Sequence, residues 1–213
     1  MADIAIFDMD GTLVDSGLDI TLSINYVRGV RYEMEPLSIR EVVDAINAPK
    51  RNLARIFYGT ELYEDEARRL FESHYYDQCI QNVAPYEGIG ALLESLKNRG
   101  FAIGVATNAP GTFARRMLSH VGFEPYFDLI VGADDVELPK PHPQMIQLHL
   151  EKHRYGPGAD RAWMVGDNSK DMEAARNAGI RSVFAGWGFS AEGEGDYCAS
   201  KPSELLRIMC EKG

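Results

Sequence analysis

The chain is poor in cysteine and in positive charge, and it lacks any long apolar run. Its three cysteines, Cys79, Cys198 and Cys210, form an odd, scattered set without metal-site spacing. This pattern argues against a disulfide framework and favours a reducing compartment. No apolar run approaches the length that a transmembrane helix needs, so a membrane-spanning segment is excluded.

Acidic residues outnumber basic ones by 32 to 22, which gives a formal net charge of -10. Nucleic acids and anionic membranes need a basic surface on their partners, so the charge argues against both as binding partners. The first residues lead directly into an apolar run, with no basic region and no signal-like segment. We therefore expect a soluble cytoplasmic protein.

The composition is that of an ordinary globular protein, and 213 residues suffice for one domain or for one domain with an insertion. From residue 16 to 82, apolar residues recur at helical spacing and no convincing strand is found. Helix breaks are expected near Gly29, at Pro36, where Ser38 is a candidate N-cap, and at residues 59–60.

From about residue 83 onward, strand and helix patterns alternate. Strands are expected near residues 101–107, 128–132, 162–166 and 181–185. Helices are expected near residues 88–98, 111–121, 143–153, 170–178 and 203–211. The alternation predicts an α/β fold with a doubly wound, mainly parallel, Rossmann-like sheet. Ligands of such sheets bind outside the carboxyl ends of the strands, where we expect Asp8, Thr107 and Asp167.

The apolar run at residues 4–7 ends in two carboxylates, Asp8 and Asp10. Both lie on the same side of an extended backbone, and Gly11 then lets the chain turn. Two anions this close repel each other unless a cation or a shared proton relieves them. The pair is therefore either part of a catalytic or ligand-binding site or an acidic turn whose side chains point into solvent.

Four segments of the chain carry polar residues in a suggestive order. Residues 8–16 read DMDGTLVDS, and residues 101–108 read FAIGVATN, a strand pattern that ends in a hydroxyl residue. Residues 140–143 read KPHP, and residues 163–171 read WMVGDNSKD, in which two aspartates stand four positions apart. Each segment is weak evidence by itself, but together they span nearly the whole chain.

In order and rough spacing, these segments resemble the four motifs of the haloacid dehalogenase-like hydrolases, in the phosphoglycolate phosphatase-like branch. The resemblance implies a Rossmann-like core over residues 1–15 and 83–213 and an α-helical cap domain over residues 16–82. It also implies Mg²⁺-dependent hydrolysis of a phosphomonoester, with a small phosphorylated metabolite as substrate and 2-phosphoglycolate as the leading choice. A monomer or a homodimer would fit this activity.

The resemblance assigns Asp8 as the nucleophile that forms an aspartyl-phosphate, and Asp10 as the general acid and base. It places Mg²⁺ on Asp8, on the backbone carbonyl of Asp10 and on Asp167. Asp171 would bind the ion through water or orient Lys140. The physics agrees, because an all-oxygen site that bridges to a phosphate suits Mg²⁺.

The resemblance also implies that the phosphoryl group is bound by Thr107, Asn108 and Lys140, and that Lys140 contacts Asp8 as well. Taken alone, Lys140 could equally be a solvated lysine in a proline-rich loop. Many phosphoglycolate phosphatase-like members have a lysine or another polar residue after the Thr-Asn pair, whereas here residues 109–110 are Ala-Pro. This departure weakens the inference of the substrate from the family, but it does not affect the inference of the reaction.

Other activities of the same superfamily can be compared at Asp10. Haloacid dehalogenases lack this second aspartate and phosphonate hydrolases change it, so Asp10 argues against both. Hexose-phosphate mutases keep both aspartates and remain the alternative enzyme. An alternative of another class is a non-catalytic sensor of a phosphorylated ligand on the same fold.

Substrate choice is expected to depend on the helical insertion. Between Asp44 and Glu61 the chain carries Lys50, Arg51 and Arg55 and no acid. Lys50 or Arg51 could contact a second anionic group of the substrate, such as a carboxylate. Solvated charges at a helix start would produce the same pattern.

Two further features are interpreted as structural. His149 and His153 have the spacing of metal ligands on a helix, but no third ligand is evident, so we interpret them as a solvated helix face. Trp187 stands between two glycines in a loop that, by the family resemblance, backs the site.

Overall fold

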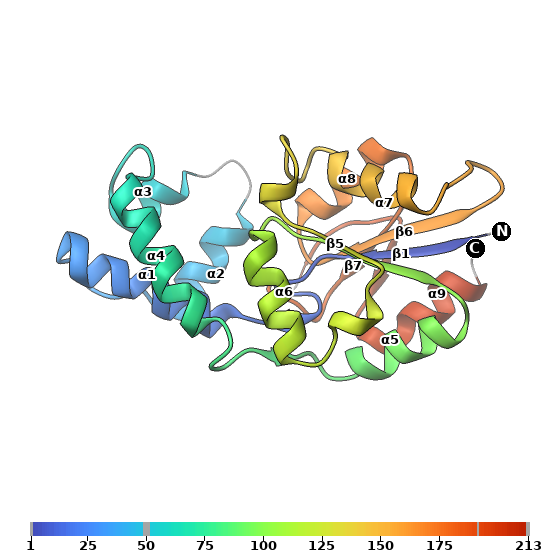
Figure 1. Ribbon diagram of the computed structural model, residues 1–213, viewed down its shortest axis with the longest axis horizontal. Helices are drawn as coiled ribbons and strands as arrows, with labels where there is room; N and C mark the ends of the chain where they lie inside the picture. The colour runs from blue at the N-terminus through green and yellow to red at the C-terminus, as the bar shows by residue number, and fades with distance from the viewer. Residues whose placement is uncertain (1, 49–51, 191, 212–213) are drawn as a thin grey trace. The chain divides into compact units, whose positions relative to one another are not determined.

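The computed structural model describes residues 2–48, 52–190 and 192–211, with Glu211 described by its backbone alone. The chain divides into two compact units. One unit combines Met1–Asp15 with Pro85–Gly213 and is α/β, and the other is Ser16–Ala84 and is helical (Figure 1).

Six parallel strands form the sheet of the α/β unit, in the order β5-β4-β1-β6-β7-β8. The strands are β1 (Asp3–Phe7), β4 (Ala102–Ala106), β5 (Leu129–Val131), β6 (Arg161–Gly166), β7 (Arg181–Ala185) and β8 (Tyr197–Ala199). The chain builds outward from β1 on one side and then on the other, so the strand order reverses at β1. The expected doubly wound, parallel sheet is confirmed.

Helices cover both faces of this sheet: α7 and α8 lie on one face, and α5 and α9 on the other (Figure 1). The helices of the α/β unit are α5 (Ile89–Asn98), α6 (Gly111–His120), α7 (Gln144–Lys152), α8 (Ser169–Ala178) and α9 (Leu205–Glu211). Three short 3₁₀ turns accompany them, η1 (Glu124–Tyr126), η2 (Ala133–Asp135) and η3 (Pro202–Glu204). A separate two-stranded sheet pairs β2 (Val14–Asp15) with β3 (Ala84–Pro85).

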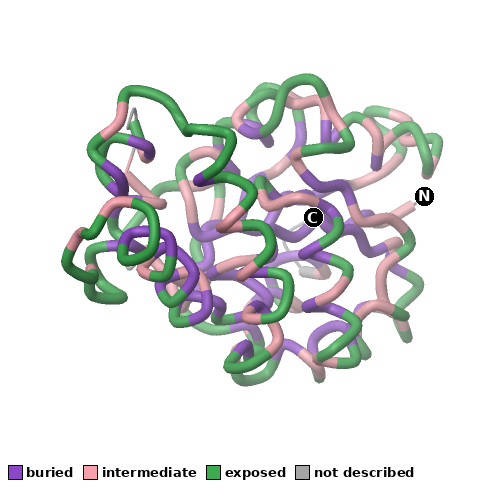
Figure 2. Tube along the Cα trace, turned by 60° about the vertical axis from the view of Figure 1, so that its left-hand side comes forward, coloured by how far each residue is buried: buried purple, intermediate pink, exposed green. Residues whose placement is uncertain are grey.

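The core of the α/β unit is built on strands that are buried on both sides. In β1, Ile4 and Ile6 belong to a cluster with Met145 and Ile146 of α7, and the alternate residue Phe7 is also fully buried. A strand covered on both faces must be apolar throughout, which explains the uninterrupted apolar run before Asp8. Figure 2 follows these buried segments through the unit.

The described residues of the second unit form four helices, and their apolar faces share one cluster. They are α1 (Gly17–Tyr32), α2 (Ile39–Asn47), α3 (Leu53–Tyr58) and α4 (Asp65–Gln78). Each helix contributes to the cluster, with Val27, Val42, Phe57 and Ala67 as examples. Ser38 caps α2 in a capping box, as the sequence predicts.

The helix break expected near Gly29 is wrong. Helix α1 continues through Gly29 to Tyr32, and the chain leaves it at Glu33 with a left-handed φ of 50°. One glycine inside a helix costs only about 1 kcal/mol, and the packing of α1 against α4 offsets that cost. Among the described residues from 16 to 82 there is no strand, and no described helix is both long and apolar enough to cross a bilayer.

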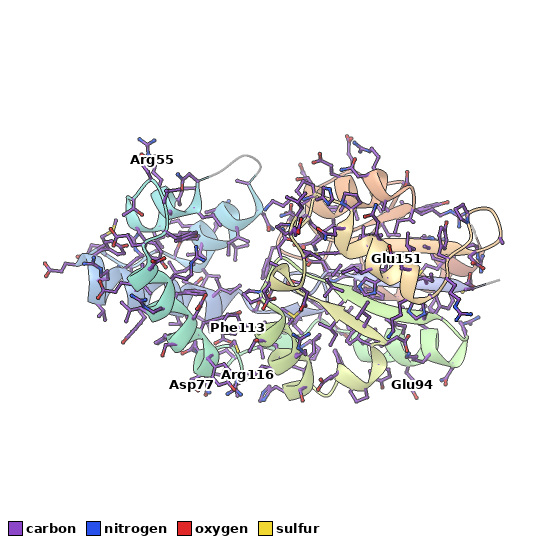
Figure 3. All side chains as sticks on the ribbon, turned by 45° about the horizontal axis from the view of Figure 1, so that its top comes forward. Arg55, Asp77, Glu94, Phe113, Arg116 and Glu151 are labelled. Carbon is purple, nitrogen blue, oxygen red and sulfur yellow. The ribbon has the colours of Figure 1, made fainter. Side chains whose placement is uncertain are left out.

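The interpretation of His149 as part of a solvated helix face is also wrong. His149 is fully buried on α7, and its Nε2 lies 3.0 Å from the carbonyl oxygen of Val105 in β4. The ring occupies the space above Gly104, where an added Cβ would lie 2.3 Å from it. A strand glycine thus makes room for a histidine. Glu151 of the same helix is exposed (Figure 3), and His153, the residue after α7, is half-buried.

We expect His149 to make the free energy of unfolding depend on pH. Burial lowers the pKa of His149 to about 4, whereas an unfolded histidine titrates near 6.5. The unfolded chain therefore binds the proton first, and His149 should remove about 3 kcal/mol of stability as the pH falls from 6.5 to 4. Denaturant unfolding at several pH values measures this effect.

The variant His149→Leu cannot take up this proton. It should be less stable than the wild type at pH 7, because it loses the bond to Val105, and the difference should shrink as the pH falls toward 4. Parallel stability curves for the two proteins would show that His149 does not titrate in this way.

Candidate active site

The parallel sheet brings three distant motif residues to one edge. Asp8 follows β1, Thr107 follows β4 and Asp167 follows β6, and these are the three neighbouring strands at which the order reverses. The pairing continues past the end of β1, because the Asp8 N–H donates to the Val165 carbonyl at 2.8 Å. A polar cluster at this edge is where an α/β sheet binds its ligand.

Lys140 places a buried ammonium between two carboxylates. Its Nζ donates to Asp8 Oδ1 at 2.7 Å and to Asp171 Oδ1 at 2.6 Å, and the residue is only 4% exposed. Burial disfavours the charge, but the carboxylates of Asp171 and Asp8 outweigh burial and raise the pKa of Lys140. The lysine is therefore charged at neutral pH, and it is not the solvated lysine of the alternative interpretation.

Asp171 has both of its oxygens engaged. Oδ1 accepts from Lys140, and Oδ2 accepts from the N–H of Asn168 at 3.1 Å, which completes the capping box of α8. Gly166 allows this approach, since a Cβ there would lie 2.3 Å from the Asp171 carboxyl. Asp171 was expected either to bind the ion through water or to orient Lys140, and the structure contains the contact with Lys140.

Asp167 is oriented by groups that come from two other loops. Its Oδ2 accepts from the N–H of Phe189 at 2.8 Å, and its Oδ1 accepts from the Thr12 hydroxyl at 3.3 Å. Gly11, with a φ of +79°, packs directly against it, because a Cβ there would lie 2.4 Å from Oδ2. Thr12 did not emerge from the sequence as a site residue, since only the fold brings it to Asp167.

The site holds more negative than positive charge. Asp8, Asp167 and Asp171 are all buried, and one oxygen of each lies within 4.8 Å of the others. Burial and the charge of Asp8 raise the pKa of Asp167 to about 7. One ammonium does not balance three carboxylates, so the cluster favours a further cation. Asp10 is half-buried in the turn that follows.

Thr107 and Asn108 lie beside this cluster but make different contacts. The Thr107 hydroxyl oxygen accepts from the N–H of Ala109 at 3.1 Å, so the hydroxyl keeps its proton for donation. The amide of Asn108 bonds to the backbone of Lys140, with distances of 2.9 and 3.0 Å. Direct contact of Asn108 with phosphate stays a prediction.

The unusual residues after the Thr-Asn pair lead into α6. Pro110 is the residue that precedes α6, and the carbonyl of Ala109 accepts from Ala133 N at 3.0 Å. The first N–H of α6, on Gly111, donates to Asp134 Oδ1 at 2.6 Å. A carboxylate at this helix N-terminus is favourable. Residues 109–110 therefore join β4 to a capped helix.

Trp187 supports the first motif from behind. Its Nε1 donates to the carbonyl oxygen of Thr12 at 3.0 Å. The neighbouring residue must be a glycine, Gly188, because a Cβ there would lie 1.9 Å from the carbonyl oxygen of Gly11. These contacts agree with a structural role for Trp187.

The predicted specificity residues Lys50 and Arg51 lie outside the described residues. Arg55, the third cation of that stretch, projects from α3 (Figure 3) and pairs with Glu61 at 3.6 Å. Both side chains are more than 70% exposed, so the pair contributes little stability. Recognition of a second anion by Lys50 or Arg51 stays a prediction.

Comparisons with known proteins agree with this arrangement. The model of the family "Haloacid dehalogenase-like hydrolase" matches residues 5–185. A phosphoglycolate phosphatase from Aquifex aeolicus is 30% identical over 97% of this chain and 96% of its own length. The pyrophosphatase PpaX from Bacillus velezensis is also 30% identical, over 95% of this chain and 94% of its own.

A solved structure extends the agreement to the fold. A haloacid dehalogenase-like family hydrolase from Streptococcus pneumoniae superposes with a TM-score of 0.80 at 27% identity, covering 98% of each chain. The family resemblance and the expectation of a phosphatase are thereby confirmed. The chain belongs to the haloacid dehalogenase-like hydrolase family.

Proposed function

We propose that this chain is a Mg²⁺-dependent phosphomonoester hydrolase that acts on a small phosphorylated metabolite through an aspartyl-phosphate intermediate. The observation that carries the proposal is the buried ammonium of Lys140, bonded to Asp8 and Asp171 at the carboxyl edge of the sheet. The contact with Lys140 at 2.7 Å holds the Asp8 carboxylate in place at the sheet edge, where a nucleophile for a bound phosphoryl group is needed.

The acidic cluster fits a magnesium ion. Its donors are all oxygens and are buried, and its three carboxylates face the single ammonium of Lys140. Asp8, Asp167 and the backbone carbonyl of Asp10 would hold the ion, while Asp171 is occupied by Lys140 and Asn168. When bound, Mg²⁺ offsets the negative charge of the phosphoryl oxygens.

In the first step, an oxygen of Asp8 attacks phosphorus, the bond to the substrate alcohol breaks, and Asp10 donates a proton to the departing oxygen. In the second step, Asp10 takes a proton from water, which attacks the same phosphorus and releases Asp8 and inorganic phosphate. A carboxylate is a weak nucleophile, but its acyl phosphate is labile, so two easier steps replace a hard one. Lys140 and the Thr107 hydroxyl stabilise the phosphoryl oxygens.

Relatives named for phosphoglycolate and for pyrophosphate reach the same 30% identity, so similarity does not separate these substrates. The chemistry of the site needs only a phosphoryl group. The helical unit Ser16–Ala84 is proposed as the cap domain that recognises the remainder of the substrate. We take 2-phosphoglycolate as the first substrate to test.

Replacing the nucleophile should abolish turnover without unfolding the protein. In the variant Asp8→Asn, the amide oxygen can still accept from Lys140, but it cannot attack phosphorus. We expect kcat for p-nitrophenyl phosphate to fall by at least about a thousandfold, while Mg²⁺-dependent binding of inorganic phosphate persists. Steady-state kinetics and calorimetry measure the two effects.

The matched control is Glu151→Gln, a carboxylate-to-amide change at an exposed position of α7 (Figure 3). It should leave kcat unchanged. Near wild-type turnover by Asp8→Asn would rule out the assigned nucleophile, and the absence of turnover in the wild type would favour the non-catalytic sensor.

An assay without a bisphosphate activator distinguishes a hydrolase from a mutase. A hydrolase releases inorganic phosphate from a monophosphate without an activator, whereas a sugar-phosphate mutase needs a bisphosphate. We expect phosphate release from 2-phosphoglycolate, pyrophosphate or a sugar phosphate, with the Asp8→Asn protein as the control for contaminating phosphatase. Isomerisation of a hexose phosphate faster than phosphate release would show a mutase instead.

A further inference from the structure

The side chain of Asn108 is bonded to the backbone of Lys140 in both directions. Its Nδ2 donates to the Lys140 carbonyl at 2.9 Å, and the Lys140 N–H donates to its Oδ1 at 3.0 Å. An asparagine amide has one oxygen and two N–H donors. The oxygen and one donor of Asn108 are therefore already used by Lys140, which calls for a role other than phosphate contact alone.

The segment around Lys140 has few backbone donors, although the carbonyl of Pro139 accepts from His142 N at 3.0 Å and the carbonyl of Pro141 accepts from Asn177 Nδ2 at 3.1 Å. Lys140 is flanked by Pro139 and Pro141, and proline has no N–H. The N–H of Lys140 is thus the one backbone donor within these three residues, and Asn108 is its acceptor. The segment lies between η2 and α7, outside any helix or strand. A buried backbone group needs a hydrogen-bond partner, and in this loop the Asn108 side chain is the partner of the Lys140 N–H.

The position of the ammonium depends on where this backbone lies. Lysine carries its charge on a flexible four-carbon stem, so the root of the stem limits which atoms Nζ can reach. From its present position, Nζ contacts Asp8 at 2.7 Å and Asp171 at 2.6 Å. A displaced Lys140 peptide would lengthen at least one of these contacts.

We infer that Asn108 is a positioning residue for Lys140. Its amide holds the Lys140 peptide, and the peptide places the ammonium against Asp8. The inference rests on the proposed function, in which Lys140 contacts the nucleophile Asp8 and the phosphoryl group. Asn108 thus acts on the chemistry through Lys140 and not through the phosphoryl group.

The chain contains a matched control for this arrangement. On α1, Asn25 makes the same reciprocal pair of bonds with the backbone of Leu37, which also follows a proline, Pro36. Both distances are 2.8 Å. Asn25→Ala therefore removes the same two bonds as Asn108→Ala, but in the helical unit.

We expect Asn108→Ala to lower kcat/KM for p-nitrophenyl phosphate by between about tenfold and a hundredfold, because a misplaced catalytic group has effects of this size. Asn25→Ala should lower the melting temperature but keep kcat/KM near the wild-type value. Circular dichroism confirms that each protein is folded. A loss in Asn108→Ala no larger than that in Asn25→Ala would overturn the inference.

A double-mutant cycle with Lys140→Ala tests the route of the effect. If Asn108 acts through Lys140, adding Asn108→Ala to Lys140→Ala should change the remaining kcat/KM by less than about twofold. A further loss as large as in the wild-type background would show that Asn108 contacts the phosphoryl group, and would overturn the inference. If turnover of Lys140→Ala is too low, calorimetric binding of inorganic phosphate replaces the rate in the cycle.

If Asn108→Ala does not fold, Asn108→Asp enters the same cycle, because its carboxylate still accepts from the Lys140 N–H but cannot donate to the carbonyl. The failure of the inference and the failure of the proposed function are distinguishable. A wild-type protein without activity on any phosphate ester ends the proposed function. An active wild type with an unimpaired Asn108→Ala ends only the positioning role.

Discussion

The buried ammonium of Lys140 is the interaction on which the rest of the site depends. Three carboxylates, those of Asp8, Asp167 and Asp171, are buried at one edge of the sheet, and each would be costly there without a nearby cation. Removing one partner from such a buried charge cluster typically costs about 3–5 kcal/mol. The fold sustains this arrangement because Asp8 and Asp167 follow fully packed strands, Asp171 lies in the first turn of α8, and each carboxylate accepts bonds that fix its direction.

Much of the fold and of the site could be predicted because both depend on patterns that are local in the sequence. Apolar runs that end in Asp8, Thr107 and Asp167 indicate buried strands, and parallel strands bring their carboxyl ends to the same edge. The position of Lys140 required the family resemblance, since nothing in a proline-rich loop identifies a buried lysine.

The remaining features depend on contacts between distant residues. Asn108 and Lys140 are 32 positions apart, and Thr12 and Asp167 are 155 apart, so no local pattern reveals either bond. The burial of His149 is not visible in the local sequence either, because it depends on the missing side chain of Gly104, which makes room for the ring. The strand β8 has three residues, too few for a periodic signal.

The insertion of the helical unit after the first strand has a consequence for how the chain folds during synthesis. Ile4 of β1 pairs with Ala102 and Ala162, so the central strand of the sheet is made first and acquires its second neighbour only when most of the chain exists. The unit Ser16–Ala84, with its own apolar cluster, is complete before either partner leaves the ribosome. The apolar strand before Asp8 therefore stays without its sheet partners while the helical unit can already fold, so it is the segment most exposed to aggregation during synthesis.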